Sequence, residues 1–134
     1  MLPLDGKILV VDDMPTLRDL VKQQLRIMGY TNLIEAGDGE QALKLMQHHE
    51  TMSAKIGFVI ADWNMPKKSG LELLKEVRAQ AHWVNLPFVL LTSESERDNV
   101  TEAILAGVSQ YIVKPFTAKA FEEKLKTAWA KHGK

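Results

Sequence analysis

Residues 7–13 read Lys-Ile-Leu-Val-Val-Asp-Asp, an aliphatic run that ends in two carboxylates. Because residues 8–11 are all apolar, a strand formed by them needs both of its faces buried. Such strands are typical of parallel sheets that are covered by helices on both sides. The stretch therefore predicts a buried strand of a parallel sheet, with Asp12 and Asp13 at its carboxyl end.

The rest of the chain alternates further apolar runs with helical patterns. After the first strand, strand-like runs are expected at residues 33–36, 58–61, 88–91 and 111–113. Apolar residues recur at helical spacing within residues 17–28, 42–46, 71–77, 100–104 and 121–129. Repeated strand–helix units predict an α/β fold, a doubly wound parallel sheet with helices on both faces.

Local signals mark where several of these helices begin and end. Side chains that can accept a hydrogen bond from the first helical turn are common N-terminal caps, and glycine commonly follows the last turn. The expected N-terminal caps are Asp38 with Gln41, Ser95 with Asp98, and Thr117, and the expected C-terminal glycines are Gly29 and Gly107.

Length and composition narrow the class of protein. The 134 residues are expected to form a single domain over residues 1–134. Seventeen basic residues balance 17 acidic residues, so the net charge offers no general attraction to nucleic acid or to a membrane surface. The chain has no cysteine, which excludes disulfides and thiolate metal sites. We found neither a signal peptide nor a membrane-spanning run, and we expect a cytoplasmic protein.

Reactive side chains follow four of the expected strands. Asp12 and Asp13 follow the first strand, Asp62 the third, Thr92 the fourth and Lys114 the fifth. The carboxyl ends of parallel strands meet at one edge of a sheet, where ligands bind in open α/β folds. We therefore expect these five side chains to converge.

The chemistry of this set points to phosphoryl transfer. Clustered carboxylates repel one another unless a cation joins them, and hard oxygen ligands favour Mg²⁺. A carboxylate such as Asp62 can attack phosphorus and form an aspartyl-phosphate. The metal and Lys114 would stabilise the charge of the transferred group, and Thr92 could donate a hydrogen bond to it.

The residues around these side chains resemble the receiver domain of two-component response regulators, in order and spacing and over almost the whole chain. Within that family they are most similar to the single-domain chemotaxis members. The matching segments are Val10–Asp13, Asp62–Pro66, Gly70–Leu74, Leu91–Thr92 and Val113–Thr117.

The resemblance implies a fold and a site. The fold would be flavodoxin-like, five strand–helix units with strand order 2-1-3-4-5. Asp62 would be the phosphoacceptor, and Mg²⁺ would be held by Asp12, Asp13, Asp62 and the backbone carbonyl of Asn64. These assignments follow from the family and not from spacing alone.

The resemblance also implies roles for the residues around the acceptor. Thr92 and Lys114 would contact the phosphoryl group, and Thr92 with Tyr111 would form the conformational switch. Asn64 and Glu94 would tune the rate of dephosphorylation. The peptide bond between Lys114 and Pro115 would be cis.

The implied function is that of a phosphorylation-activated response regulator in a chemotaxis-type pathway. A histidine kinase would donate the phosphoryl group, and the switched form would bind an output protein such as the flagellar motor switch. The protein would dephosphorylate itself, with a phosphatase as a further partner. It would act as a monomeric signalling protein and not as an enzyme with a separate substrate.

Other functions fit part of the same evidence. Residues 93–97, Lys119 and residues 126–127 depart from the chemotaxis pattern on the output surface, which leaves open a phosphate sink or a receiver with a non-motor partner. A Mg²⁺-dependent phosphohydrolase would share the site residues but would need a substrate pocket or a cap. Residues 37–42 match the dinucleotide fingerprint G-x-G-x-x-A, although a turn and a helix cap explain them better.

Overall fold

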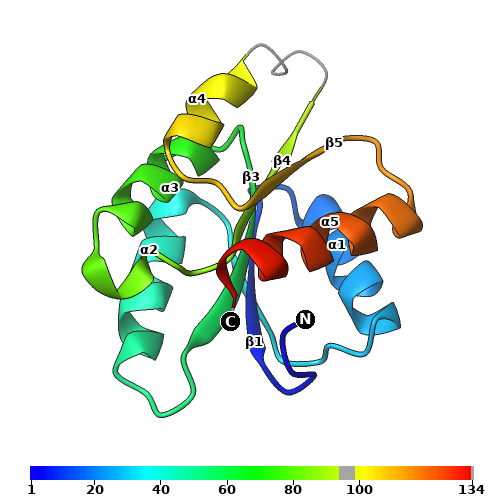
Figure 1. Cartoon of the computed structure of the whole chain (residues 1–134), viewed down its shortest axis with the longest axis horizontal. Helices are drawn as coiled ribbons and strands as arrows, with labels where there is room; N and C mark the ends of the chain where they lie inside the picture. The colour runs from blue at the N-terminus through cyan, green and yellow to red at the C-terminus, as the bar shows by residue number, and fades with distance from the viewer. Residues whose placement is uncertain (94–98, 134) are drawn as a thin grey trace.

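The computed structural model describes residues 1–93 and 99–133 as a five-stranded parallel sheet covered by helices (Figure 1). The strand order is β2-β1-β3-β4-β5, and all four neighbouring pairs are parallel. The strands are β1 (Lys7–Val11), β2 (Leu33–Ala36), β3 (Ile56–Asp62), β4 (Phe88–Thr92) and β5 (Gln110–Val113). The predicted fold class and strand order are therefore confirmed.

Helices pack on both faces of the sheet, as the alternating pattern predicted. In Figure 1, α1 and α5 lie on one side of the sheet, and α2, α3 and α4 lie on the other. The helices are α1 (Pro15–Ile27), α2 (Gly39–Glu50), α3 (Gly70–Arg78), α4 (Val100–Leu105) and α5 (Ala118–His132). A single turn of 3-10 helix, η1 (Ala81–Trp83), precedes β4 and was not predicted.

The sheet separates two hydrophobic cores. In β1, Leu9 and Val11 face the core beneath α2 and α3, whereas Ile8 and Val10 face the core beneath α1 and α5. Each of these side chains is at most 1% exposed. Burying one aliphatic side chain contributes about 1.5–3 kcal/mol, so the run without polar residues favours an interior position for β1, between β2 and β3.

Most of the predicted helix caps are present. The Asp38 side chain accepts a hydrogen bond from the Gln41 amide, and Thr117 caps α5 through the Ala120 amide. The Gln41 side chain accepts from the Gly37 amide instead of closing the expected box on Asp38. The C-terminal glycines have the expected positive φ, and the cap proposed for Ser95 with Asp98 lies outside the described residues.

Two helical residues predicted on apolar faces are more exposed than their spacing indicates. Ile104 is 54% exposed because α4 is only six residues long and meets the core through the small side chain of Ala103. Leu20 is 46% exposed and lines a cavity at the edge of α1. Helical spacing alone does not distinguish a core position from a cavity wall.

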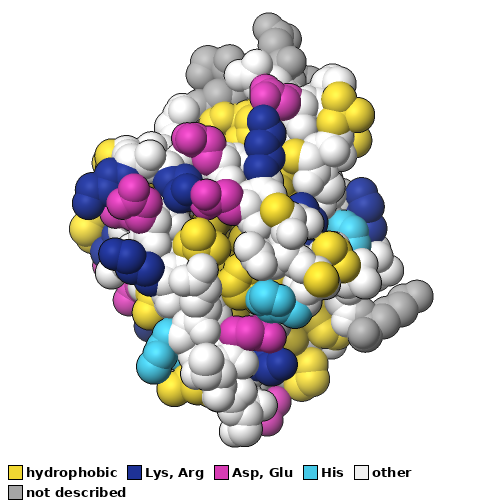
Figure 2. Space-filling model, turned by 90° about the vertical axis from the view of Figure 1, so that its left-hand side faces the viewer, with side chains coloured by type: hydrophobic (Ala, Val, Ile, Leu, Met, Phe, Trp, Pro, Cys, Tyr) yellow, Lys and Arg dark blue, Asp and Glu magenta, His cyan; other side chains and the backbone are white. Residues whose placement is uncertain are grey.

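The outer surface shows no segregation of charge over α2 and α3. Figure 2 shows this face, where basic and acidic side chains alternate. Among the described residues, no helix combines the length and the apolar character needed to cross a bilayer.

Candidate functional site

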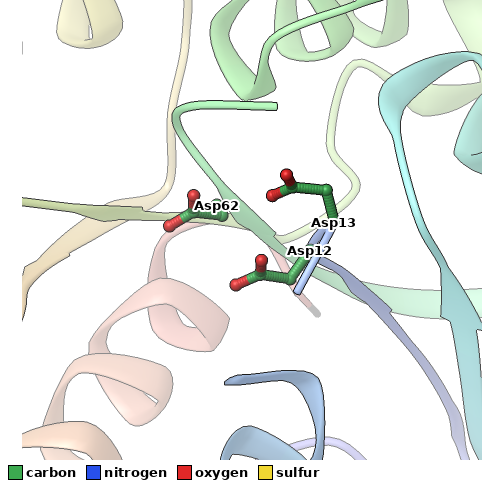
Figure 3. A group of neighbouring side chains, drawn as sticks. All are labelled: Asp12, Asp13 and Asp62. Carbon is green, nitrogen blue, oxygen red and sulfur yellow. The ribbon is translucent and has the colours of Figure 1, made fainter. Parts of the chain in front are cut away.

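Three carboxylates meet at the carboxyl edge of the sheet. Asp12 directly follows β1 and Asp62 is the last residue of β3, and these two strands are neighbours with Val11 paired to Ala61. Carboxylate oxygens of Asp12, Asp13 and Asp62 lie within 4.8 Å of one another. Figure 3 shows their side chains side by side and pointing in the same direction. The predicted convergence of these acids is confirmed.

Asp12 is the most constrained member of this acidic cluster. It is 2% exposed, and its Oδ1 accepts a hydrogen bond of 3.0 Å from the Met14 amide. Within the described residues, no group donates a hydrogen bond to its buried Oδ2. Burial is the main reason that the pKa of Asp12 rises to about 6, and the charge of Asp62 adds to the effect.

The donor set fits a hard divalent cation. A buried carboxylate oxygen without a hydrogen-bond donor is costly unless a cation takes the donor's place. Asp12 Oδ2 has two further carboxylates beside it, and Mg²⁺ is commonly held by one or two carboxylates plus water and phosphate oxygens. The acidic cluster therefore suits Mg²⁺.

Lys114 places a positive charge directly against Asp62. Its Nζ lies 2.5 Å from Asp62 Oδ1, and the Asp62 side chain is 8% exposed. The Lys114 amide donates a hydrogen bond of 2.7 Å to the carbonyl of Thr92, so the ends of β4 and β5 are tied together at the site. The sequence prediction that strand ends would bring Asp62 and Lys114 together is confirmed.

Thr92 is the last residue of β4, and Tyr111 lies on β5, the strand that Lys114 directly follows. Thr92 is fully buried at the end of β4, and its hydroxyl donates to the Ser93 carbonyl at 3.2 Å. Tyr111 is half-buried on β5, and the Lys124 ammonium lies 5.1 Å from its ring centroid. The Lys114–Pro115 bond is cis, as expected.

Of the two residues expected to tune dephosphorylation, the structure describes only Asn64. Asn64 is exposed in the loop that follows β3, two residues beyond Asp62. Glu94 lies outside the described residues. Their assigned roles remain predictions.

Gly70 shapes the site and was missed by sequence reasoning. A Cβ atom at this position would lie 2.3 Å from the Asp62 carbonyl oxygen. The loop after β3 folds back, and the Gly70 amide donates to the Trp63 carbonyl at 2.9 Å. Only a residue without a side chain allows α3 to begin so close to Asp62, and the glycine directly after a capping serine was the available signal.

Gly39, the second glycine of the stretch that resembled a dinucleotide motif, has a packing role. A Cβ atom on Gly39 would lie 2.7 Å from the carbonyl oxygen of Lys68, so α2 packs directly on the loop after β3. The first turn of α2 is capped by the Asp38 carboxylate. A phosphate at this helix terminus would face that negative charge, which favours the turn-and-cap interpretation over nucleotide binding.

An apolar cavity of about 300 Å³ opens beside the acidic cluster. Apart from Asp12 and Lys114, its walls are aliphatic or aromatic; they are Leu17, Leu20, Val21, Leu91, Pro115 and Phe116. Such a lining does not supply the polar contacts by which a hydrolase would select a small phosphorylated metabolite.

Comparison with known proteins agrees with this geometry. The family description "Response regulator receiver domain" matches residues 8–126. The chemotaxis protein CheY of Pseudomonas aeruginosa is 44% identical over 119 residues, which are 89% of this chain and 92% of that protein. The chemotaxis protein CheY-3 of Vibrio cholerae is 45% identical over 119 residues, which are 89% of this chain and 88% of that protein.

A solved structure supports the same relationship. The chemotaxis response regulator CheY4 of Vibrio cholerae is 31% identical and superposes with a TM-score of 0.78, covering 92% of this chain and 98% of that one. Sequence, fold and the acidic cluster thus lead to one conclusion. The chain belongs to the family of response regulator receiver domains, which are signalling phosphoacceptors.

Proposed function

We propose that residues 1–134 act as a single phosphorylation-activated receiver in a chemotaxis-type two-component pathway, with Asp62 as the phosphoacceptor. The observation that carries this proposal is the contact of Lys114 Nζ with Asp62 Oδ1 beside the carboxylates of Asp12 and Asp13. A nucleophilic carboxylate, a fixed cation and a metal-binding acidic pair are together at one strand edge. The similarity to chemotaxis proteins favours this pathway.

The metal-binding residues are proposed to be Asp12, Asp13, Asp62 and the backbone carbonyl of Asn64. Mg²⁺ bound there would offset the charge of the incoming phosphoryl group. Asp12 has the buried oxygen that most needs such a partner. The exposed position of Asp13 leaves that side of the cluster open to water.

The transfer step forms a bond between an Asp62 carboxylate oxygen and phosphorus and breaks the bond between phosphorus and the donor imidazole nitrogen. The imidazole leaves with its electron pair and takes up a proton from water. Lys114 stabilises the negative charge of the transferred group, since its ammonium already lies against the acceptor. Hydrolysis of the resulting acyl phosphate returns Asp62 to its free form, at a rate tuned by Asn64 and Glu94.

The conformational response begins at Thr92. Its hydroxyl donates to Ser93 in the unphosphorylated chain and would instead donate to the phosphoryl oxygen. Because the Lys114 amide is bonded to the Thr92 carbonyl, movement at the end of β4 reaches β5 and therefore Tyr111. The phosphoryl group would shift a two-state equilibrium of this region toward the output form.

The partners follow from this chemistry and from the relatives. A histidine kinase supplies the phosphoryl group in the cytoplasm, and a phosphatase can remove it. The output partner is a protein, and the chemotaxis relatives favour the flagellar motor switch. The alternatives are a non-motor partner and a role as a phosphate sink. The protein is proposed to act as a monomer.

The proposal is tested by intact-protein mass after brief incubation with Mg²⁺ and a small phosphodonor. We expect the wild type and an Asp5→Asn control to gain one phosphoryl group and Asp62→Asn to gain none. Asp5 is an exposed acid that precedes β1, at the opposite end of that strand from the cluster, which makes it a matched control. Equal labelling of Asp62→Asn would overturn the assignment of the acceptor. Sustained turnover of a diffusible phosphate ester would favour the phosphohydrolase instead.

A further inference from the structure

Arg18 connects the end of β1 to β2 through two hydrogen bonds. It lies in the first turn of α1, and its Nη1 donates to the carbonyl oxygen of Asp12 at 2.6 Å. Its Nε donates to Glu35 Oε1 on β2 at 3.1 Å. One planar guanidinium therefore spans two strands at the edge where the acidic cluster forms.

The carbonyl that Arg18 contacts belongs to the peptide between two members of that cluster. The Asp12 amide makes the last sheet-like bond of this segment, to the Ala36 carbonyl at 3.1 Å, and the chain then leaves the sheet. From this point the peptide joining Asp12 to Asp13 is oriented by Arg18. Fixing this peptide fixes the directions in which both carboxylates leave the backbone.

The anchor of Arg18 is itself held in place. Glu35 Oε2 lies 2.9 Å from Lys22 Nζ, and this hydrogen bond, with the one from Arg18, lowers the pKa of Glu35. A surface ion pair of this kind contributes only about 0–1 kcal/mol to stability. The ion pair of Arg18 with Glu35 does not explain why Arg18 also donates a short hydrogen bond to the Asp12 carbonyl. Orientation of the Asp12–Asp13 peptide does explain this second hydrogen bond.

We propose that Arg18 is a positioning residue of the metal site, which it preorganises by holding the Asp12 carbonyl. This inference rests on the proposed function, because it assumes that the acidic cluster binds Mg²⁺. It also predicts that loss of Arg18 weakens Mg²⁺ binding, which is the opposite of what simple electrostatics predicts. A cation next to a metal site repels the metal, so loss of charge alone would strengthen Mg²⁺ binding.

The test is the dissociation constant of Mg²⁺, measured by NMR titration of the amides of residues 12–14 and 62–64. We expect Arg18→Ala to weaken binding about tenfold, as loss of outer contacts to metal ligands commonly does. Arg18→Lys keeps the charge but not the planar fork, and it should restore only a small part of the loss. Lys22→Ala removes a cation from the same network without touching Asp12, and it should stay within about twofold of the wild type.

The outcomes separate this inference from the proposed function. Unchanged or tighter Mg²⁺ binding by Arg18→Ala, or an equal loss in Lys22→Ala, would overturn the role of Arg18 and leave Asp62 phosphorylation intact. Absence of Mg²⁺ binding by the wild type would instead overturn the proposed metal site. Urea unfolding without Mg²⁺ checks that each variant is folded. If Arg18→Ala does not fold, Glu35→Gln keeps Arg18 but weakens its anchor, and it should give a smaller loss in the same direction.

Discussion

Each end of the sheet holds a charged side chain, half-buried at the amino end and buried at the carboxyl end, and the two are surrounded differently. At the amino end, Arg78 donates from all three guanidinium nitrogens: to the Gly107 carbonyl at 2.9 Å, the Trp83 carbonyl at 2.7 Å and the Ser109 hydroxyl at 3.4 Å. At the carboxyl end, Asp12 Oδ2 has no hydrogen-bond donor within the described residues.

This difference separates a structural charge from a functional one. The half-buried Arg78 joins the end of α3 to η1 and to the loop before β5, so its charge serves the fold. Asp12 accepts a hydrogen bond from one backbone amide, and burial with the charges of Asp62 and Asp13 raises its pKa although the charge of Lys114 opposes the rise. Removing a charge whose hydrogen bonds are made leaves its partners unpaired and lowers stability, whereas a buried charge left without a donor lowers stability until a ligand arrives.

The largest expected effect is at the amino end. Arg78→Ala leaves the carbonyls of Gly107 and Trp83 without the Arg78 donor, and we expect a loss of about 3 kcal/mol in the free energy of unfolding. Arg26→Ala, an exposed arginine in the last turn of α1, is the matched control and should change stability by less than about 0.5 kcal/mol. Urea unfolding measures both.

The folded fraction of Arg78→Ala should still accept a phosphoryl group on Asp62. Equal stability of Arg78→Ala and the wild type would contradict the structural role assigned to Arg78. Loss of phosphorylation by a folded Arg78→Ala would show that the two ends are coupled.

The next largest effect has the opposite sign. The pKa of Asp12 is raised to about 6 in the folded protein, from 3.8. As the pH rises from 4 to 6, the unfolded chain therefore releases the Asp12 proton before the folded chain does, and the metal-free protein loses stability. We expect Asp12→Asn, which carries no charge, to exceed the wild type in free energy of unfolding by about 1–3 kcal/mol at pH 7.5 without Mg²⁺.

That advantage of Asp12→Asn should shrink as the pH falls from 6 toward 4, because the wild-type carboxyl then becomes protonated. Asp13→Asn is the control, since Asp13 is exposed. A less stable Asp12→Asn at pH 7.5 would contradict the view that this charge is strained in the absence of a cation.

The smallest effect concerns the pH dependence of the amino end. Burial, with the nearby charges of Arg78 and Lys131, lowers the pKa of His132, whose Nδ1 lies 2.6 Å from the Ser109 hydroxyl. The folded protein therefore favours the neutral form of His132. Because the folded-state pKa lies below 6.5, the contribution of neutral His132 to stability is complete above pH 6.5 and is lost as the pH falls through the folded-state pKa. His132→Gln should therefore lose less stability than the wild type between pH 7 and pH 5. An identical loss would show that His132 does not contribute.

The fold and most of the site could be predicted because both depend on strand ends. A buried parallel strand places the residue after it at the ligand-binding edge, so Asp12, Asp62 and Lys114 are brought together by topology alone. The aspartate pair at residues 12–13 and the lysine before a proline were visible as patterns in the chain. The same reasoning located Thr92 at the end of β4.

The remaining features depend on tertiary contacts that no local pattern encodes. The bonds of Arg18 and Arg78 are made by long side chains to backbone carbonyls elsewhere in the fold. The need for glycine at position 70 arises from the approach of α3 to Asp62. Leu20 has helical spacing but lines a cavity, because periodicity identifies a helix face and not what lies opposite it.

The central claim is that the open carboxylate of the acidic cluster awaits a divalent cation, and Mg²⁺-linked stability tests it most directly. The measurement is the free energy of unfolding of the wild type and Asp12→Asn at pH 7.5 over a series of Mg²⁺ concentrations. We expect the wild type to gain about 1.4 kcal/mol when Mg²⁺ reaches ten times its dissociation constant. Asp12→Asn should gain far less over the same series. A wild type whose stability does not change with Mg²⁺, or an equal gain in both proteins, would contradict it.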